Sequence, residues 1–292
     1  MAITAAQVKE LREMTGAGMM ECKKALIEAD GDMNKAVDVL RTRGLAAAVK
    51  KAGRATNEGT CSTFVSEDRK VAAVVEVNCE TDFVGGNEKY KAFAARIAKA
   101  AALADAADVE GLKAADAGNG ETVGEALTEA IHIFGENMQI SRFARIAVAG
   151  TGAVASYIHL GGKMGVLVEF AFNKPETAFT EAFQVAGKDV CMQVAAADPV
   201  AVSREAVPAD VVEHEMEIYK AKAAATGKPA AIQERIALGQ MQKYYKSFCL
   251  LEQVFVKDPD TPVADYLKGV SKAVDDQISV VSFKRFKLGE AL

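Results

Sequence analysis

Residues 76–86 have the sequence EVNCETDFVGG and begin at the end of an apolar, β-branched run over residues 71–77. A run of that length and composition predicts a β-strand. Residues 78–86 then predict a loop, although they include a large apolar side chain, Phe83, next to the carboxylate of Asp82. Because loops lie at the protein surface, the Phe83 ring either folds back into the core or projects toward a partner.

The segment EVNCETDFV, residues 76–84, closely resembles the second signature of the bacterial-type elongation factor Ts family. Members of that family are guanine-nucleotide exchange factors of elongation factor Tu. The family usually continues with a small and a basic residue, whereas Gly85 and Gly86 follow here, and this departure predicts a looser exit from the loop. The resemblance implies a partner-binding group that dislocates the partner's Mg²⁺ and consists of Thr81, Asp82, Phe83 and Val84.

Composition and charge limit the class of protein. The chain has 292 residues, half of them hydrophobic, and a formal net charge of −5. That length suffices for one large domain or a few small ones, and the mildly acidic balance disfavours direct nucleic-acid binding. We expect a cytoplasmic protein that is not bound to a membrane. Residues 1–4 do not resemble a secretory signal, and no apolar run is long enough to span a bilayer.

The sequence offers no metal site or cofactor site. Its five cysteines are scattered, so none forms a zinc-type C-x-x-C pair. Gly161-Gly162-Lys163 lacks the leading glycine of a phosphate loop, and we therefore expect no bound nucleotide.

The N-terminal region predicts a three-helix domain over residues 1–44. Thr4 and Gln7 form a plausible capping box at the first helix, whose inward face would carry Val8, Leu11 and Met14. Residues 15–18 break that helix, and Asp30-Gly31-Asp32 separates the next two. Gly44 is expected to end the third helix, and residues 45–58 are expected to form a linker.

Residues 11–26, LREMTGAGMMECKKAL, resemble the first elongation factor Ts signature. In that family the module resembles a ubiquitin-associated domain and docks on the nucleotide-binding domain of elongation factor Tu. Met19 and Met20 are adjacent, so both cannot face one small core, and at least one is expected as an exposed, adaptable contact. The alternative is that both are buried. The partner-binding residues that the resemblance implies here are Val8, Leu11, Arg12, Met19 and Met20.

The middle of the chain repeats itself at an offset of 93 positions (169 − 76), where residues 74–77 align with residues 167–170. Both copies predict a strand, a loop and an alanine-rich helix. We infer two related α/β subdomains with antiparallel sheets, residues 59–150 and 151–260. The predicted elements are strands 60–66 and 70–78, helix 87–104, an acidic connection 104–120, helix 121–136, and strands 140–149, 154–160 and 165–172.

The two copies differ in the loop after the first aligned strand. Where the first copy has Phe83, the second has NKPET, residues 173–177, which predict an ordinary turn and a helix N-cap. A fold that needs an aromatic plug at this position would be expected to have one in both copies. The comparison therefore favours a functional role for Phe83.

The last third of the chain predicts a projecting pair of helices over residues 208–247, with a turn at residues 226–229. In the family a coiled-coil insertion lies at this place and can join two copies, so a homodimer is a possible assembly. Residues 249–256 predict a strand. Residues 261–292 predict a C-terminal module, and its family counterpart contacts the nucleotide-binding domain of elongation factor Tu. The fold class is thus α+β.

Candidate catalytic residues are scarce. His132 and His214 have no evident nucleophilic partner in sequence, so a structural role is the default for both. His159 ends a predicted strand before two glycines, and a similar histidine in the family faces elongation factor Tu. The resemblance implies an exchange factor without covalent chemistry. It would bind GDP-bound and nucleotide-free elongation factor Tu and promote GDP release.

Two stretches of the sequence point to other function classes. Residues 146–155, IAVAGTGAVA, have the outline of a dinucleotide fingerprint and would indicate an NAD-type oxidoreductase. That fingerprint needs a helix directly after its glycines, whereas residues 154–160 predict a strand. An RNA-binding scaffold would depend on the basic cluster Lys50, Lys51 and Arg54, which a solvated linker also explains.

Overall fold

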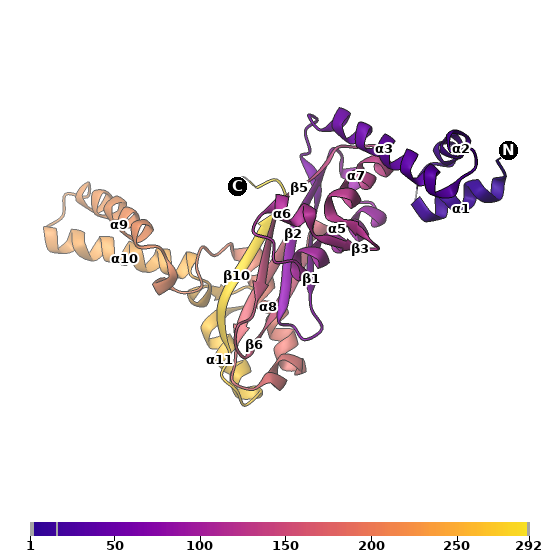
Figure 1. The fold of residues 1–292 in the computed structure, drawn as a ribbon. Coiled ribbons are helices and arrows are strands. Elements are labelled where there is room, and N and C mark those ends of the chain that lie inside the picture. Colours follow the sequence, from indigo (N-terminus) through magenta and orange to yellow (C-terminus); the bar gives the residue numbers. More distant parts are fainter. Residues whose placement is uncertain (1–2, 16, 291–292) are drawn as a thin grey trace.

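The computed structural model describes residues 3–15 and 17–290 and combines helices with antiparallel sheets, as the α+β prediction expected. The N-terminal helices lie at one end of the elongated molecule, and two sheets with their covering helices form the middle. Helices α9 (Ala209–Ala224) and α10 (Ala230–Phe248) project at the other end (Figure 1). Three expectations fall outside the described residues. They concern Gly16 in the first helix break, residues 1–2 of the N-terminal domain, and residues 291–292 of the C-terminal module.

The N-terminal helices are α1 (Ala5–Thr15), α2 (Met19–Glu28) and α3 (Met33–Lys51). The predicted capping box is confirmed: Thr4 N–H donates to Gln7 Oε1 at 3.0 Å, and Gln7 N–H donates to Thr4 Oγ1 at 3.3 Å. Asp32 caps α3 by accepting from Lys35 N–H. The three helices enclose a small apolar core that includes Val8, Leu11, Cys22, Ala25, Leu26, Ala36 and Leu40.

Helix α3 runs through Gly44 to Lys51, so the prediction that Gly44 ends the third helix is wrong, and residues 45–51 are not linker. Gly44 is buried against α7 (Val123–Phe134), where an added Cβ would lie 3.7 Å from His132 Cβ. The missing side chain thus lets α3 pass close to the core. Residues 45–51, LAAAVKK, are mostly good helix formers and extend the helix.

The first sheet has the strand order β1-β2-β5, with β2 in the centre and all pairs antiparallel. Helices α5 and α7 cover its outer face. The predicted loose connection over residues 104–120 is wrong in part, because Asp108 caps a short helix there by accepting from Gly111 N–H. The elements are β1 (Glu58–Val65), β2 (Val71–Cys79), α5 (Glu88–Leu103), α6 (Val109–Ala114), β3 (Asp116–Gly118), β4 (Glu121–Thr122), α7 (Val123–Phe134) and β5 (Met138–Ala147).

The second sheet repeats this topology with the order β6-β7-β10. In both sheets a hairpin is followed by a helix, and a later strand pairs antiparallel with the second hairpin strand. Residues 279–287 therefore complete the second sheet and do not form a separate module. The elements are β6 (Gly152–His159), η1 (Leu160–Gly162), β7 (Met164–Ala171), η2 (Pro175–Phe179), α8 (Glu181–Ala197), α11 (Val263–Ala273) and β10 (Ser279–Lys287).

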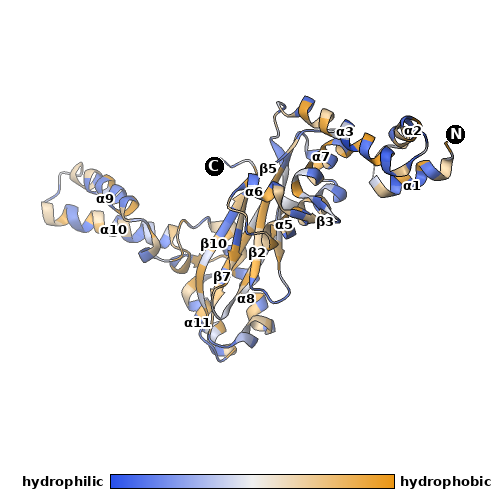
Figure 2. Ribbon diagram, viewed as in Figure 1, coloured by the Kyte–Doolittle hydropathy of each residue, from blue (hydrophilic) through white to orange (hydrophobic). Residues whose placement is uncertain are grey.

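The two sheets pack face to face, and apolar residues concentrate along these central strands (Figure 2). This interface contains a charged pair in which Glu76 is buried and Arg142 is half-buried: Arg142 Nε donates to Glu76 Oε2 at 2.8 Å. The C-terminal segment completes the pair, since Gly289 N–H donates to Glu76 Oε1 at 3.0 Å and Arg142 Nη2 donates to Lys287 O at 2.9 Å. The chain end thus links the second sheet to the first.

Helices α9 (Ala209–Ala224) and α10 (Ala230–Phe248) pack against each other, with Ala223, Ala237 and Met241 buried between them. The strand expected over residues 249–256 is mostly wrong. The chain there forms the single turn η4 (Leu250–Glu252) and the short strand β8 (Val254–Phe255), which pairs with β9 (Asp258–Pro262). Within the described residues, no helix is long and apolar enough to cross a membrane.

Candidate functional site

The predicted loop after β2 contains a single helical turn, α4 (Asp82–Gly85), which Thr81 caps by accepting from Val84 N–H at 3.4 Å. Phe83 is 87% exposed, whereas Val84 packs against the first core. The alternative that Phe83 plugs its own core is therefore wrong. A helical turn presents the aromatic ring to solvent while its neighbour anchors the turn.

Glu136, in the segment before β5, holds the start of this turn. Its Oε2 accepts from both Glu80 N–H and Thr81 N–H at 3.0 Å, and its Oε1 accepts from the Thr81 hydroxyl at 2.6 Å. Glu136 is half-buried, so these bonds are partly shielded from water. The turn is fixed at its base, and the Phe83 side chain stays free.

Glu80 adds a second tie. Its Oε1 accepts from Asn137 N–H at 2.6 Å and from Arg54 Nη1 at 3.2 Å. The hydrogen bond from Asn137, with help from Arg54, outweighs partial burial and holds the pKa of Glu80 below its usual value. Arg54 belongs to the predicted basic cluster and is paired within the protein, whereas Lys50 and Lys51 of that cluster lie in the last turn of α3, so the linker interpretation holds for Arg54 alone.

The exit of the turn is packed and capped, where the sequence predicted a looser one. Gly85 is buried, and an added Cβ would lie 3.0 Å from Gly59 O and 3.3 Å from Gly59 N. Glycine therefore allows α4 to approach β1 closely. Two residues later Asn87 caps α5 by accepting from Lys89 N–H at 2.9 Å.

His159 lies at the end of β6, as predicted, with Nδ1 2.9 Å from the Tyr157 hydroxyl oxygen. The next residue, Leu160, is largely exposed and has φ = 47°, a left-handed conformation that is rare for leucine. Gly162 follows with φ = 111° and lies against Thr60, so a Cβ there would come within 1.9 Å of Thr60 Oγ1. The sequence did not indicate Leu160, although the two glycines after it mark a tight turn.

The two turns meet at the start of β1, where Gly59 contacts Gly85 and Thr60 contacts Gly162. Phe83 and Leu160 thus project from neighbouring turns, one from each sheet. This exposed apolar pair suits contact with a protein surface.

The N-terminal helices offer a second exposed group. Met19 and Met20 are 58% and 63% exposed, so the prediction that at least one faces solvent is confirmed. Arg12 is exposed as well. Val8 and Leu11, however, are buried in the helix core, and the implied direct contact through these two side chains is wrong. They fix the helices that carry the exposed residues.

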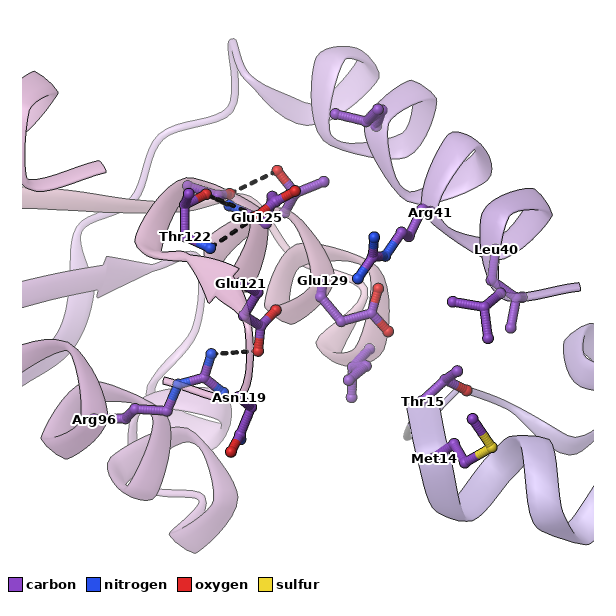
Figure 3. A pocket seen from close by; sticks show the side chains of 15 residues that line it. Met14, Thr15, Leu40, Arg41, Arg96, Asn119, Glu121, Thr122, Glu125 and Glu129 are labelled. Atoms are coloured by element: carbon purple, nitrogen blue, oxygen red, sulfur yellow. Dashed lines mark hydrogen bonds and ion pairs between the residues drawn. The ribbon is translucent and has the colours of Figure 1, made fainter. Parts of the chain in front are cut away.

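A cavity of about 700 Å³ lies between α1, the middle of α3 and α7, beside the place where Gly44 packs against α7 (Figure 3). Met14, predicted to face inward, is exposed and lines it. Glu129 reaches in from α7, and burial raises the pKa of its carboxyl group. Beside the cavity, His132 Nε2 lies 2.8 Å from Glu21 Oε2, which supports the structural role expected for this histidine. Neither the α4 turn nor His159 lines the cavity, so it is separate from the Phe83 surface.

The NAD-type alternative is not supported by the fold. Residues 150–155 lead into strand β6, so the helix that a dinucleotide fingerprint needs is replaced by a strand. Among the described residues, no group of three or more histidine, cysteine, aspartate or glutamate side chains is placed to hold a metal ion.

Comparison with known proteins gives a consistent result. The family model for elongation factor TS matches residues 80–290. The chain is 51% identical over 294 residues to elongation factor Ts of Trichlorobacter lovleyi, covering 100% of this chain and 94% of that one. It is 49% identical over 290 residues to elongation factor Ts of Clostridium botulinum (strain Eklund 17B / Type B), covering 99% of this chain and 94% of that one.

Proposed function

The chain belongs to the elongation factor Ts family, and we propose that it uses the Phe83 turn to open the nucleotide site of elongation factor Tu. The family is that of the nucleotide exchange factors of elongation factor Tu, so this protein acts in translation elongation and performs no covalent chemistry. The observation that carries the proposal is the 87% exposure of Phe83 on a turn that Glu136 holds in place.

In the proposed mechanism, Asp82 and Phe83 enter between helices of elongation factor Tu, while Thr81 and Val84 keep the turn in shape. The insertion displaces the groups that hold Mg²⁺ and the GDP phosphates. Without the ion, the phosphate charge is poorly compensated, and GDP dissociates faster. Asp82 is exposed and adds a negative charge at the tip of the turn.

Exchange requires additional contacts, because the coupling between two binding sites is reciprocal. GDP weakens the binding of this protein to elongation factor Tu by the same free energy by which this protein weakens the binding of GDP. Burying the Phe83 ring supplies only about 1.5–3 kcal/mol. We assign the remaining contacts to Arg12, Met19 and Met20 on the N-terminal helices and to the His159 rim, by which we mean His159 and the turn of residues 160–162 that follows it.

The proposal includes finer features of the architecture. The N-terminal helices act as a ubiquitin-associated-like module, and the two sheets with their helices form two core subdomains, the second of which extends to β10. Helices α9 and α10 form a coiled coil that can join two copies, an assignment supported by Ile232 and Leu238, which α10 leaves exposed. The protein works in the cytoplasm and does not contact nucleic acid directly.

The test is the release of fluorescent GDP from elongation factor Tu, measured by stopped flow with and without the protein. We expect the wild-type protein to accelerate release and Phe83→Ala, alone or with Asp82→Ala, to lose most of that acceleration. Since the Phe83 ring is exposed, the melting temperature should stay nearly unchanged. A large fall in melting temperature with normal exchange would contradict the proposal.

A further inference from the structure

The second subdomain contains a turn that is built like the Phe83 turn. Asp276, in the segment before β10, accepts from Asn173 N–H and Lys174 N–H at 3.0 Å each and from the Thr177 hydroxyl at 2.7 Å. Burial alone would raise the pKa of Asp276, but these hydrogen bonds outweigh it and lower the pKa.

The match to the first subdomain extends to sequence positions. Glu136, before β5, binds the N–H groups of Glu80 and Thr81. Adding the repeat offset of 93 to 80 and 81 gives 173 and 174, the two residues that Asp276 binds. In both subdomains a carboxylate before the third strand therefore fixes the connection after the central strand.

This second turn also presents a phenylalanine. Residues 175–179 form η2, and Phe179 at its end is 58% exposed. Thr180 then caps α8 by accepting from Phe183 N–H at 3.3 Å. The expectation of an ordinary turn at residues 173–177, with an aromatic in the first copy only, is thus wrong. The repeat preserves an exposed aromatic at the same place in the topology, three residues later than position 176, where the offset of 93 would place the counterpart of Phe83.

The surroundings of Phe179 are acidic. Glu176 and Glu181 are exposed on either side of Phe179 in sequence, and Asp275 is exposed next to Asp276. Lys174 forms an ion pair with Asp275, since its Nζ lies 2.8 Å from Asp275 Oδ2. Glu176 and Glu181, three residues before and two residues after Phe179, are the exposed charges next to it in sequence, and this arrangement complements an apolar surface that is rimmed by lysine or arginine.

We propose that Phe179 is a second anchor, which docks on an apolar, basic-rimmed surface of the same elongation factor Tu molecule that Phe83 engages. This inference depends on the proposed function, because Phe83 supplies the first contact. The Phe179 turn follows the end of β7 that lies opposite the His159 rim, so the two anchors touch separate surfaces. The packed sheets hold the anchors at a fixed spacing, which lowers the entropy cost of binding both.

A contact remote from the nucleotide site and the inserted Phe83 turn should affect exchange kinetics differently. Phe179 lies away from the Phe83 turn, so it strengthens the complex with elongation factor Tu without acting on GDP. We expect Phe179→Ala to raise the half-saturating concentration for GDP release about tenfold and to leave the maximal rate unchanged. Leu103→Ala, which truncates a 66% exposed leucine on α5, is the matched control and should change neither quantity.

Charge complementarity gives a second variant. Glu181→Lys should also raise the half-saturating concentration, and it should weaken the salt dependence of the wild-type protein. Phe179→Ala should melt near the wild-type temperature, because the altered side chain is exposed. Glu181→Lys reverses a charge in the first turn of α8 and should melt slightly lower.

The inference is overturned if Phe179→Ala binds with wild-type half-saturation, or if it lowers the maximal rate as Phe83→Ala is expected to do. Failure of the proposed function is a separate result. In that case, Phe83→Ala would exchange GDP normally, or the wild-type protein would not accelerate release at all.

Discussion

The carboxylate of Glu136 receives both the backbone N–H and the side-chain hydroxyl of Thr81, at 3.0 and 2.6 Å. The same hydroxyl accepts from Val84 N–H, so one carboxylate orders the whole turn that carries Phe83. The rigidity of the Phe83 turn therefore depends on this contact, which joins residues 55 positions apart in sequence.

Glu136→Ala removes this contact and leaves Phe83 in place. We expect a maximal rate of GDP release that falls roughly tenfold, and a free energy of unfolding lower by about 1–3 kcal/mol because two N–H groups lose their acceptor. Stopped-flow release and chemical denaturation measure the two effects. Glu136→Gln keeps an acceptor oxygen and should recover part of both. Full activity of the alanine variant would show that the turn does not need this tie.

Gly162→Ala tests the rim beside His159. An added Cβ would lie 1.9 Å from Thr60 Oγ1 on a backbone with φ = 111°, so the rim has to shift away from β1. We expect a loss of roughly 1–3 kcal/mol in stability together with weaker binding of elongation factor Tu. Gly161→Ala is the control: its φ is 65° with no atom within 4 Å, so only the left-handed backbone costs energy, about 1–2 kcal/mol. Equal effects on binding would contradict a role for the rim.

Met19 and Met20 should contribute to the affinity for elongation factor Tu and not to the maximal rate of GDP release. The double variant Met19→Ser, Met20→Ser should raise the half-saturating concentration several-fold and keep the maximal rate, since neither side chain lies near the Phe83 turn. Ile27→Ser is the control, because Ile27 is similarly exposed on the same helix. Titration of nucleotide-free elongation factor Tu by calorimetry reports the affinity directly, and identical affinities for both variants would argue against this contact.

Glu129 makes stability depend on pH. Burial raises the pKa of its carboxyl group, so the folded state binds the proton more tightly than the unfolded state does. The stability of the wild-type protein therefore falls as the pH rises from the ordinary glutamate pKa of about 4.3 toward the raised folded value. Glu129→Gln removes this dependence. We expect the variant to melt at a higher temperature than wild type at pH 7 and at a similar temperature near pH 4.

Local sequence patterns predicted much of the fold. Capping residues such as Thr4 and Asp32 mark helix starts that the structure confirms, and the repeat at offset 93 anticipated two sheets of equal topology. The continuation of α3 through Gly44 was missed, because it depends on how closely α7 approaches. Whether a helix ends at a glycine or continues through it is decided by tertiary packing, which the glycine alone does not reveal.

The candidate site was predicted in part. The signature residues 81–84 do form an exposed turn, and His159 does lie at a rim. Glu136 escaped notice because its partners are distant in sequence, and Phe179 because its segment resembles an ordinary turn. The helical spacing of Val8 and Leu11 also fits an inward face, and the structure places both side chains in the core of the N-terminal helices.

The bond from Gly289 N–H to Glu76 spans 213 positions, nearly the whole interval between the first sheet and the end of the chain. A polypeptide still emerging from the ribosome lacks residues 287–289, so its Glu76 and Arg142 each miss a backbone partner. A charge pair in that state is costly to desolvate. The two sheets should therefore close on each other only after residues 287–289 have left the ribosome, which makes this short segment a checkpoint for maturation.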